Sequence, residues 1–351
     1  MESALRSSMK IAAVMSVAAL ALAACGTSTP TTPGSSGATT AAKVFKVGMA
    51  YDVGGRGDQS FNDAAAVGLD KAKVELKADT KEATAVAGEP ESAREERLQQ
   101  LIDAGYTTVV AVGFAYAPAV KKVAAANPEV KFALIDSTDA AGPNIESLTF
   151  AEQEGSFLVG AAAALKSKTG SIGFIGGVNV DLIKKFEAGY IAGAKAVNPA
   201  IKVQTKYLTQ PPDFTGFNDP AKGKTAGEGM FQQGADVVYA AAGGSGGGMF
   251  TAAAALGKMA IGVDSDQALT APAAVKDVII TSMIKKVDVA TFDFIKAESE
   301  GKFTAGTKVY DLKAGGVGYS TTGGKMDDIK TKLDDFKTQI IDGKIVVPTK
   351  P

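Results

Sequence analysis

Apolar residues follow two alternating spacings along the chain from residue 44 onward. A continuous apolar run such as VFKVGMAY at 44–51 predicts a buried strand. Apolar residues that recur every three or four positions, as Phe61, Ala65 and Leu69 do, predict a helix. Further strands are predicted at 82–87, 107–113, 132–136, 145–150, 171–177, 203–208, 236–244, 259–264 and 278–284, and helices lie between most of them.

This alternation predicts an α/β fold in which helices cover parallel sheets. Roughly 300 residues exceed the core of one such sheet, so we expect two doubly wound lobes. Ligands of such folds bind at the carboxyl ends of the strands. Glycine-rich and acidic segments follow several predicted strands, which favours one ligand cleft. Ser60 and Asp63 are similar to a capping box, so the first helix is expected to begin at the first of these segments.

The first 42 residues have a different character. Arg6 and Lys10 precede an apolar run at 11–21, and LAAC follows at 22–25. This layout is typical of a secretory signal, and its cysteine resembles that of a bacterial lipobox. We therefore predict a signal peptide at 1–24, lipid attachment at Cys25 and a location at the cell membrane, facing the periplasm or the cell exterior. A membrane-spanning helix is the alternative, but the run is shorter than the ~20 residues that a span needs.

Residues 25–42 are rich in serine, threonine, proline and glycine, which predicts a flexible tether. The folded part is therefore expected to begin near Lys43.

Composition excludes several classes of function. The formal net charge of −1 argues against binding to nucleic acid or to an anionic membrane surface. The sequence contains no histidine, which removes the commonest general base and metal ligand. We therefore predict no metal, no cofactor and no catalytic residues.

Two segments are similar to phosphate-binding motifs but do not complete them. GKT at 223–225 lacks the earlier glycine of a P-loop, because position 218 is asparagine. Asp219 and Pro220 instead predict a helix start. The glycine-rich run at 243–248 does not fit a dinucleotide fingerprint, yet glycine amides such as that of Gly244 are available to donate to ligand oxygens.

The loop YDVGGRGDQSFN at 51–62 combines glycines with two carboxylates. Asp52 and Asp58 repel an anion and accept hydrogen bonds, so they suit a ligand that presents hydroxyl or N–H donors. Phe61 either belongs to the core or offers its ring to a flat ligand. The alternative for the two aspartates is that Asp52 caps the turn and Asp58 stays in solvent.

The second half of the chain offers similar groups after its strands. Phe214 and Phe217 lie in a Pro/Gly-rich loop, where a large apolar side chain is expected to cover a ligand. Alternation along the chain places Asp264 and Asp266 on one side. Lys285 and Lys286 follow another strand and can balance their charge, and the alternative for these residues is a surface role.

Six segments, in this order, resemble the basic membrane protein family of ABC-transporter substrate-binding lipoproteins, which includes receptors for purine nucleosides. They are DVGGRGDQSFN (52–62), GFAYAPAV (113–120), FNDPAKGK (217–224), GADVVYAAAGGSGGG (234–248), IGVDSDQ (261–267) and TSMIKKVD (281–288).

The resemblance implies a type I periplasmic-binding fold, with two α/β lobes joined by a hinge and a ligand between them. The first lobe would span 43–150 with a return at about 280–310, and the second 151–279 with a C-terminal segment at about 311–351. Ligand contacts carried over by motif are Asp52, Phe61, Asn62, Phe217, Gly244, Asp264 and Lys285, with Asp58, Phe114, Phe214, Asp266 and Lys286 as weaker candidates.

The leading hypothesis is a lipid-anchored, non-enzymatic receptor that passes a nucleoside to an ABC permease and its ATPase subunits, with a purine nucleoside as the favoured ligand. One alternative is an exported hydrolase of nucleosides or sugars that uses paired acids. Another is a ligand sensor of the same fold that works without a transporter.

Overall fold

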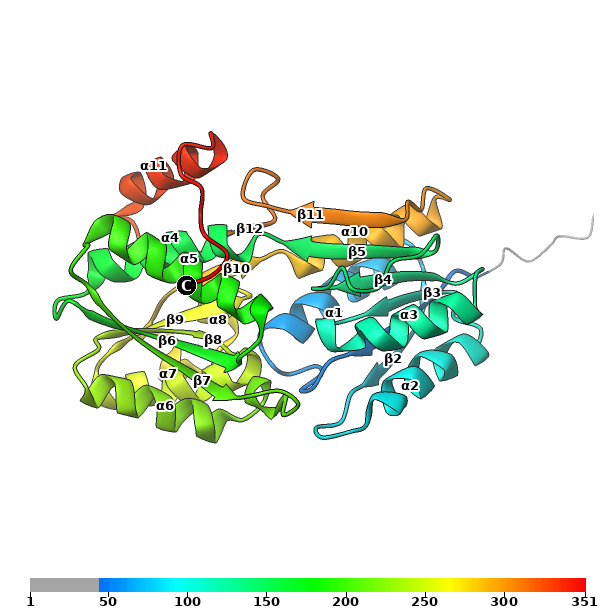
Figure 1. Cartoon of the computed structure of the whole chain (residues 1–351), viewed down its shortest axis with the longest axis horizontal. Coiled ribbons are helices and arrows are strands. Elements are labelled where there is room, and N and C mark those ends of the chain that lie inside the picture. The colour runs from blue at the N-terminus through cyan, green and yellow to red at the C-terminus, as the bar shows by residue number, and fades with distance from the viewer. Residues whose placement is uncertain (1–43) are drawn as a thin grey trace, which may run out of the picture. The chain divides into compact units, whose positions relative to one another are not determined.

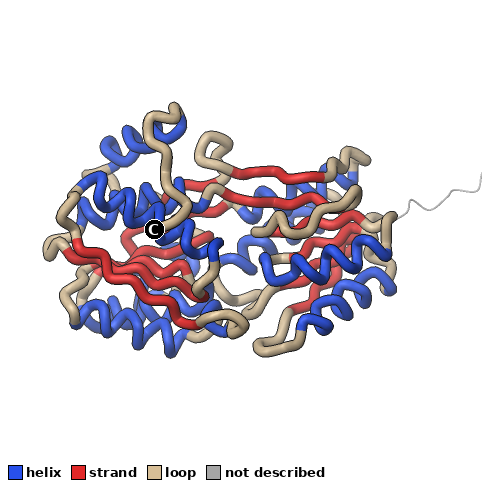
Figure 2. Tube along the Cα trace, in the orientation of Figure 1, coloured by secondary structure: helices blue, strands red, loops and turns tan. Residues whose placement is uncertain are grey.

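The computed structural model describes residues 44–351, which form two six-stranded sheets covered by helices (Figures 1 and 2). The predicted signal peptide at 1–24, the tether at 25–42 and the lipidation site Cys25 lie outside the described residues. Within residues 44–351, no helix combines the length and the apolar character needed to cross a membrane.

Both sheets have the same doubly wound order. The first runs β11-β5-β4-β3-β1-β2 and is parallel throughout, and the second runs β12-β10-β9-β8-β6-β7 with only β12 antiparallel. The first sheet consists of β1 (Lys46–Tyr51), β2 (Asp79–Thr84), β3 (Thr108–Ala111), β4 (Lys131–Ile135), β5 (Ile145–Phe150) and β11 (Gly306–Tyr310). The second consists of β6 (Ser171–Val178), β7 (Lys202–Thr209), β8 (Val237–Ala241), β9 (Met259–Asp264), β10 (Ile279–Lys285) and β12 (Val317–Tyr319). The predicted two-lobed α/β architecture is confirmed.

Helices pack in pairs on the faces of each sheet. The first lobe carries α1 (Phe61–Glu75) with α10 (Val287–Ser299), and α2 (Glu91–Asp103) with α3 (Ala117–Ala126). The second carries α4 (Glu152–Lys166) with α5 (Asp181–Val197), α6 (Pro220–Gln232) with α7 (Gly246–Leu256), and α11 (Lys330–Ile341) against α4. Short helices complete the chain: α8 (Gln267–Thr270), α9 (Ala273–Lys276), η1 (Phe114–Tyr116), η2 (Thr215–Phe217), η3 (Gly243–Ser245) and η4 (Thr322–Gly324).

The edge strand β2 shows where the apolar pattern gives a weak signal. Its sequence, DTKEAT, is largely exposed, and it occupies Asp79–Thr84 rather than the predicted 82–87. The central strand β3, in contrast, is fully buried and lies within the predicted 107–113. A strand at the edge of a sheet faces solvent on one side and so needs fewer apolar residues.

The chain crosses between the lobes three times, after β5, after β10 and after β11. Strand β10 pairs with β9 in the second sheet, so the return to the first lobe begins with α10 rather than at about 280. One apolar core continues through both lobes beside these crossings, from Leu69 of α1 to Phe157 of α4. The crossings therefore form the hinge of the two-lobed body.

Helices α4 and α5 approach so closely that glycine is required at their contact. A Cβ on Gly193 would lie 1.9 Å from the carbonyl oxygen of Phe157. A contact below about 3 Å forces the helices apart, so the packing of the second lobe depends on this glycine.

Gly193→Ala is expected to lower the free energy of unfolding by about 1–3 kcal/mol, because the added methyl overpacks the α4–α5 contact. Urea denaturation measures the change. Gly229→Ala in α6 is the matched control, since a Cβ there meets no atom within 4 Å. The control is expected to be stabilised by about 0.5–1 kcal/mol. Equal effects of the two changes would contradict the packing argument.

Candidate ligand-binding site

A cavity lies between the two lobes at the carboxyl ends of their strands. It contains about 560 Å³ of space between atoms, counting the open space at its mouth. The lining residues come from both lobes: Asp52, Val53, Asp58, Phe61, Asn62, Gly113, Phe114, Asp136, Leu182, Ile183, Phe186, Phe217, Ala241, Gly243, Val263, Asp264 and Lys285.

Asp58 organises the β1–α1 loop. Its carboxylate accepts the backbone N–H groups of Ser60, Asn62 and Asp63 at 2.9–3.1 Å, together with the Asn62 side-chain amide at 3.0 Å. Asp58 therefore caps α1, and the expected capping box of Ser60 and Asp63 is wrong, because Ser60 makes no side-chain cap bond. Asp63 instead accepts the N–H groups of Gly57 and Gln59.

Asp52 lies at the end of β1 and is held from two sides. Its backbone N–H donates to Asn62 Oδ1 at 3.1 Å, and its Oδ1 accepts the N–H of Val53 at 2.8 Å. Behind it stands Gly113, where φ is +106° and a Cβ would lie 2.7 Å from Asp52 Oδ2. Glycine at this position lets the carboxylate remain in the cavity wall.

Asp264 connects the two lobes at the floor of the cavity. It ends β9 with φ +63°, and its Oδ2 accepts the hydroxyl of Ser60 at 2.6 Å. The hydroxyl of Ser265 donates in turn to the backbone oxygen of Ser60 at 3.1 Å. The residue that was expected to cap α1 therefore joins the first lobe to the second.

A buried ion pair forms the hinge side of the cavity. The ammonium of Lys285, at the end of β10, lies 2.6 Å from Asp136 Oδ2 in the first lobe and 3.4 Å from Glu152 Oε1 at the start of α4. All three side chains are at most 5% exposed. Asp136 Oδ1 is buried without a hydrogen-bond partner. Asp136 lines the cavity, and its Oδ1 remains an acceptor without a partner among the described residues.

Aromatic rings enclose the same ammonium. Lys285 Nζ lies 4.9–5.5 Å from the ring centres of Phe61, Phe150 and Phe186. On the other side of the cavity, Phe114 meets Phe217 edge to face at 6.4 Å. The cavity thus combines flat apolar faces with a few charged groups.

Burial perturbs the charges of the site. It raises the pKa of Asp52 to about 6 and that of Asp264 to about 6, although the nearby Arg94 and Lys285 respectively oppose the shift. Burial also raises the pKa of Asp58 and of Asp136. Burial alone would lower the pKa of Lys285, but the surrounding carboxylates outweigh it and raise that pKa. Near neutral pH the cavity is rich in hydrogen-bond acceptors, which suits a ligand that carries donors.

Within residues 44–351, no three acidic side chains are grouped so that they could hold a metal ion. The acidic groups of the cavity are spread around its wall instead of converging on one point.

Residues 45–350 match the family described as "ABC transporter substrate-binding protein PnrA-like" (Bmp). The chain belongs to the Bmp family. The predicted family is thereby confirmed, and the protein is an extracytoplasmic substrate-binding protein of an ABC transporter.

Among curated Bmp relatives, the ABC transporter nucleoside-binding protein BmpA of Lactococcus lactis is 37% identical over 87% of this chain and 90% of that protein. Basic membrane protein A of Borreliella burgdorferi is 34% identical over 88% of both chains. A solved ABC-transporter solute-binding protein from Aeropyrum pernix superposes with a TM-score of 0.75 at 32% identity, covering 87% of this chain and 94% of that chain. These likenesses support the predicted periplasmic-binding-protein fold.

Eight of the predicted site residues of this Bmp protein line the one cavity: Asp52, Asp58, Phe61, Asn62, Phe114, Phe217, Asp264 and Lys285. Gly244 does not line it, and the neighbouring Gly243 does. Phe214 lines a separate cavity at the rim of the cleft. Asp266 and Lys286 line a third cavity, to which Asp264 and Lys285 also contribute.

Asp264 and Asp266 both line the third cavity, but only Asp264 also lines the interlobe cavity. The left-handed backbone of Asp264, with φ +63°, ends the strand, so two-residue alternation does not continue past it. The Asp266 carboxylate accepts the hydroxyl of Thr322 instead.

Sequence reasoning missed several cavity residues, chiefly Asp136 and Phe186. A signal for Asp136 was present, because Asp136-Ser137 follows a buried strand as Asp264-Ser265 does. Both aspartates also have positive φ values of +70° and +63°. Phe186 lies on the apolar face of α5, where its sequence does not distinguish it from a core residue.

Asp52→Asn is expected to change the dependence of stability on pH. Burial raises the pKa of Asp52 from 3.8 to about 6, so the folded state holds this proton more tightly than the unfolded chain does. The free energy of unfolding of the wild type should therefore fall relative to the variant, by about 3 kcal/mol, as pH rises from about 4 through about 6.

Urea denaturation across this pH range measures the difference. Asp139→Asn, which alters an exposed carboxyl of the first lobe, is the matched control. If the difference in the free energy of unfolding between the wild type and Asp52→Asn stays constant with pH, the Asp52 proton is held no more tightly in the folded state than in the unfolded chain.

Proposed function

We propose that this protein is the lipid-anchored receptor of an ABC importer for nucleosides, with a purine nucleoside as its ligand. The observation that carries the proposal is the interlobe cavity, in which aromatic rings from both lobes face buried carboxylates and one ammonium. A nucleoside has a flat base that stacks on aromatic rings and a ribose that donates hydroxyl groups. The printed name of the Lactococcus relative supports the same ligand class.

In this proposal the base lies between Phe61 of the first lobe and Phe217 of the second. Asp264 and Asp136 accept ribose hydroxyls, since both line the cavity and Asp136 Oδ1 has no partner. Asp52 accepts from the base edge or from the ribose. Asn62 acts mainly by fixing Asp52 and Asp58, because its amide is already bonded to both.

Lys285 has one donor left for the ligand. An ammonium carries three N–H donors, and Asp136 and Glu152 face two of them. The third is available to a ribose oxygen, because Lys285 also lines the cavity. The lobes then close about the hinge, and the closed form is delivered to the permease and its ATPase subunits.

One observation favours a second candidate, a nucleoside hydrolase. Buried carboxyls whose pKa is about 6, such as those of Asp52 and Asp264, are suited to general acid catalysis. Incubation of the protein with inosine or adenosine, followed by chromatography, separates the two candidates. The receptor proposal requires intact nucleoside, and catalytic release of free base would contradict it.

Calorimetric titration with inosine, adenosine, uridine, ribose and an amine tests the ligand class. We expect a purine nucleoside to bind with a Kd of about 1 μM or tighter, which corresponds to about −8 kcal/mol. Binding of ribose or the amine alone would contradict the proposal.

Phe61→Ala and Phe217→Ala are each expected to weaken nucleoside binding by about 1–3 kcal/mol through loss of base stacking. Val74→Ala on α1 is the control, since its side chain is exposed and far along the helix from Phe61. The same titration measures all three variants. If Phe61→Ala binds as Val74→Ala does, the base does not stack on Phe61.

Cys25→Ser is expected to release the protein from the membrane, because we propose that the lipid on Cys25 is its only anchor. Fractionation of cells that produce the wild type or Cys25→Ser, followed by immunoblotting, measures the location. Thr27→Ser, in the same tether, is the matched control. Membrane retention of Cys25→Ser would contradict the lipid anchor.

A further inference from the structure

Phe214 reaches across the cleft without lining the interlobe cavity. It lies in the β7–α6 loop of the second lobe, yet its ring meets Phe114 of the first lobe edge to face, at 5.7 Å and 82°. Its ring centre also lies 6.0 Å from the guanidinium of Arg94 on α2. Strands β2 and β7 are the sheet edges farthest from the crossing strands β11 and β12. This contact therefore joins the lobes at the rim opposite the hinge.

Arg94 is a buried arginine that makes no close ion pair. The residue is 6% exposed, and its Nε is buried without a hydrogen-bond partner. Glu89 Oε1 is 3.8 Å away, but Glu89 makes its close pair with Arg97, at 2.5 Å. The Arg94 guanidinium instead lies near two rings, 5.8 Å from that of Tyr116 and 6.0 Å from that of Phe214. A guanidinium beside aromatic faces gains cation–π stabilisation.

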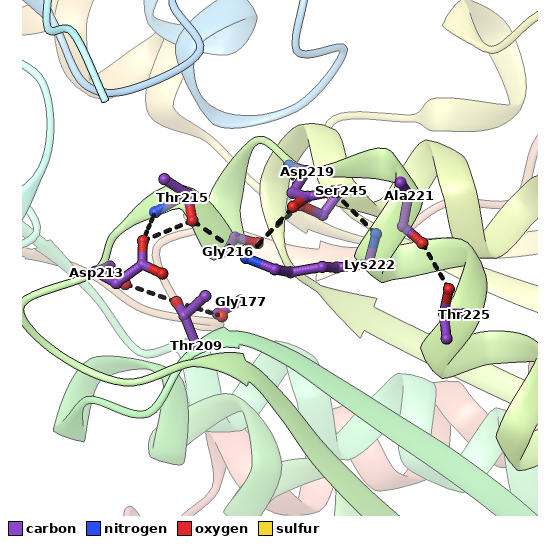
Figure 3. A network of polar contacts seen from close by, with 10 residues as sticks. All are labelled: Gly177, Thr209, Asp213, Thr215, Gly216, Asp219, Ala221, Lys222, Thr225 and Ser245. Carbon is purple, nitrogen blue, oxygen red and sulfur yellow. Dashed lines mark hydrogen bonds and ion pairs between the residues drawn. The ribbon is translucent and has the colours of Figure 1, made fainter. Parts of the chain in front are cut away.

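The loop that carries Phe214 is braced on both sides of it (Figure 3). Asp213 Oδ1 accepts the backbone N–H of Thr215 at 2.9 Å, and the Asp213 carbonyl accepts the hydroxyl of Thr209 at 2.6 Å. Ser245 donates to the Gly216 carbonyl at 2.8 Å and accepts the N–H of Asp219 at 2.7 Å. All of these partners belong to the second lobe, so the bonds that hold the loop do not depend on the first lobe, and little conformational entropy is lost when Phe214 docks.

We propose that Phe214 is an interlobe latch, received by Phe114 and Arg94, that holds the cleft closed and sets the rate of ligand release. Phe217, three residues later, lines the interlobe cavity and also contacts Phe114, whereas Phe214 lines only the rim cavity. Phe114 lines both the interlobe cavity and the rim cavity, and it links the latch to the bound ligand.

The latch has a kinetic signature. The contact of Phe214 with Phe114 and Arg94 exists only when the lobes are closed. Loss of this contact therefore favours the open form with or without ligand. Ligand leaves from the open form, and dissociation should accelerate. Association, which begins with the open form, should change little.

Stopped-flow displacement of a bound purine nucleoside tests this signature, and this arm rests on the proposed function. The nucleoside should dissociate from Phe214→Ala roughly tenfold faster, as expected for the loss of one aromatic pair and one cation–π contact, with an association rate within about twofold of the wild type.

Gln210→Ala, an exposed change in the same loop, is the control. Phe214→Tyr should restore slow release. Phe214→Leu should release quickly, and wild-type release by Phe214→Leu would overturn the role of the ring.

A second arm needs no ligand. The full chain with Cys25→Ser has no other cysteine, so Lys81→Cys on β2 and Lys206→Cys on β7 can carry paired spin labels at two exposed sheet edges. In the empty protein, Phe214→Ala should shift the label distances to longer values, and the exposed change Gln210→Ala should leave them unchanged.

The displacement experiment and the spin-label experiment together distinguish the latch proposal from the proposed function. If no nucleoside binds but the distances shift, the proposed function fails and the latch stands. If Phe214→Ala matches Gln210→Ala in label distances, and in release wherever a ligand binds, the latch is wrong.

Discussion

Burial of one positive charge is the constraint on which the cleft depends. A lysine ammonium placed away from water requires close carboxylates, and removal of one partner from such a pair is strongly destabilising. Lys285 finds Asp136 in the first lobe and Glu152 where the chain enters the second. These contacts bring together the end of β10, the loop after β4 and the start of α4. The hinge and the cavity wall are consequently built from the same ion pairs.

The two sides of the cleft are held by different physical interactions. On the hinge side, charge and a continuous apolar core keep the lobes connected. At the rim, aromatic contacts reach across, with Phe214 against Phe114 and Arg94 and Phe217 against Phe114. The interactions at the rim are weaker and can break during each opening. This asymmetry lets the hinge remain intact while the proposed latch controls how long the ligand stays.

The sequence predicts the fold well, because strands buried on both faces, such as β3, leave continuous apolar runs. It predicts the edge strand β2 poorly, because an exposed edge needs no such run. At the site, the motifs predict correctly which loops reach the cleft. Only the three-dimensional structure shows which residues of each loop line the cavity. Phe214 and Phe217 are alike in sequence but line different cavities, and Asp58 caps α1 while the Ser60 hydroxyl donates to Asp264 of the other lobe.

A crystal structure of the protein grown with inosine tests the central claim most directly. The account predicts the purine ring between Phe61 and Phe217, with ribose hydroxyls toward Asp264 and Asp136 and the Lys285–Asp136 pair still intact. Inosine bound in the rim cavity beside Arg94, or an interlobe cavity that holds only water, would contradict it.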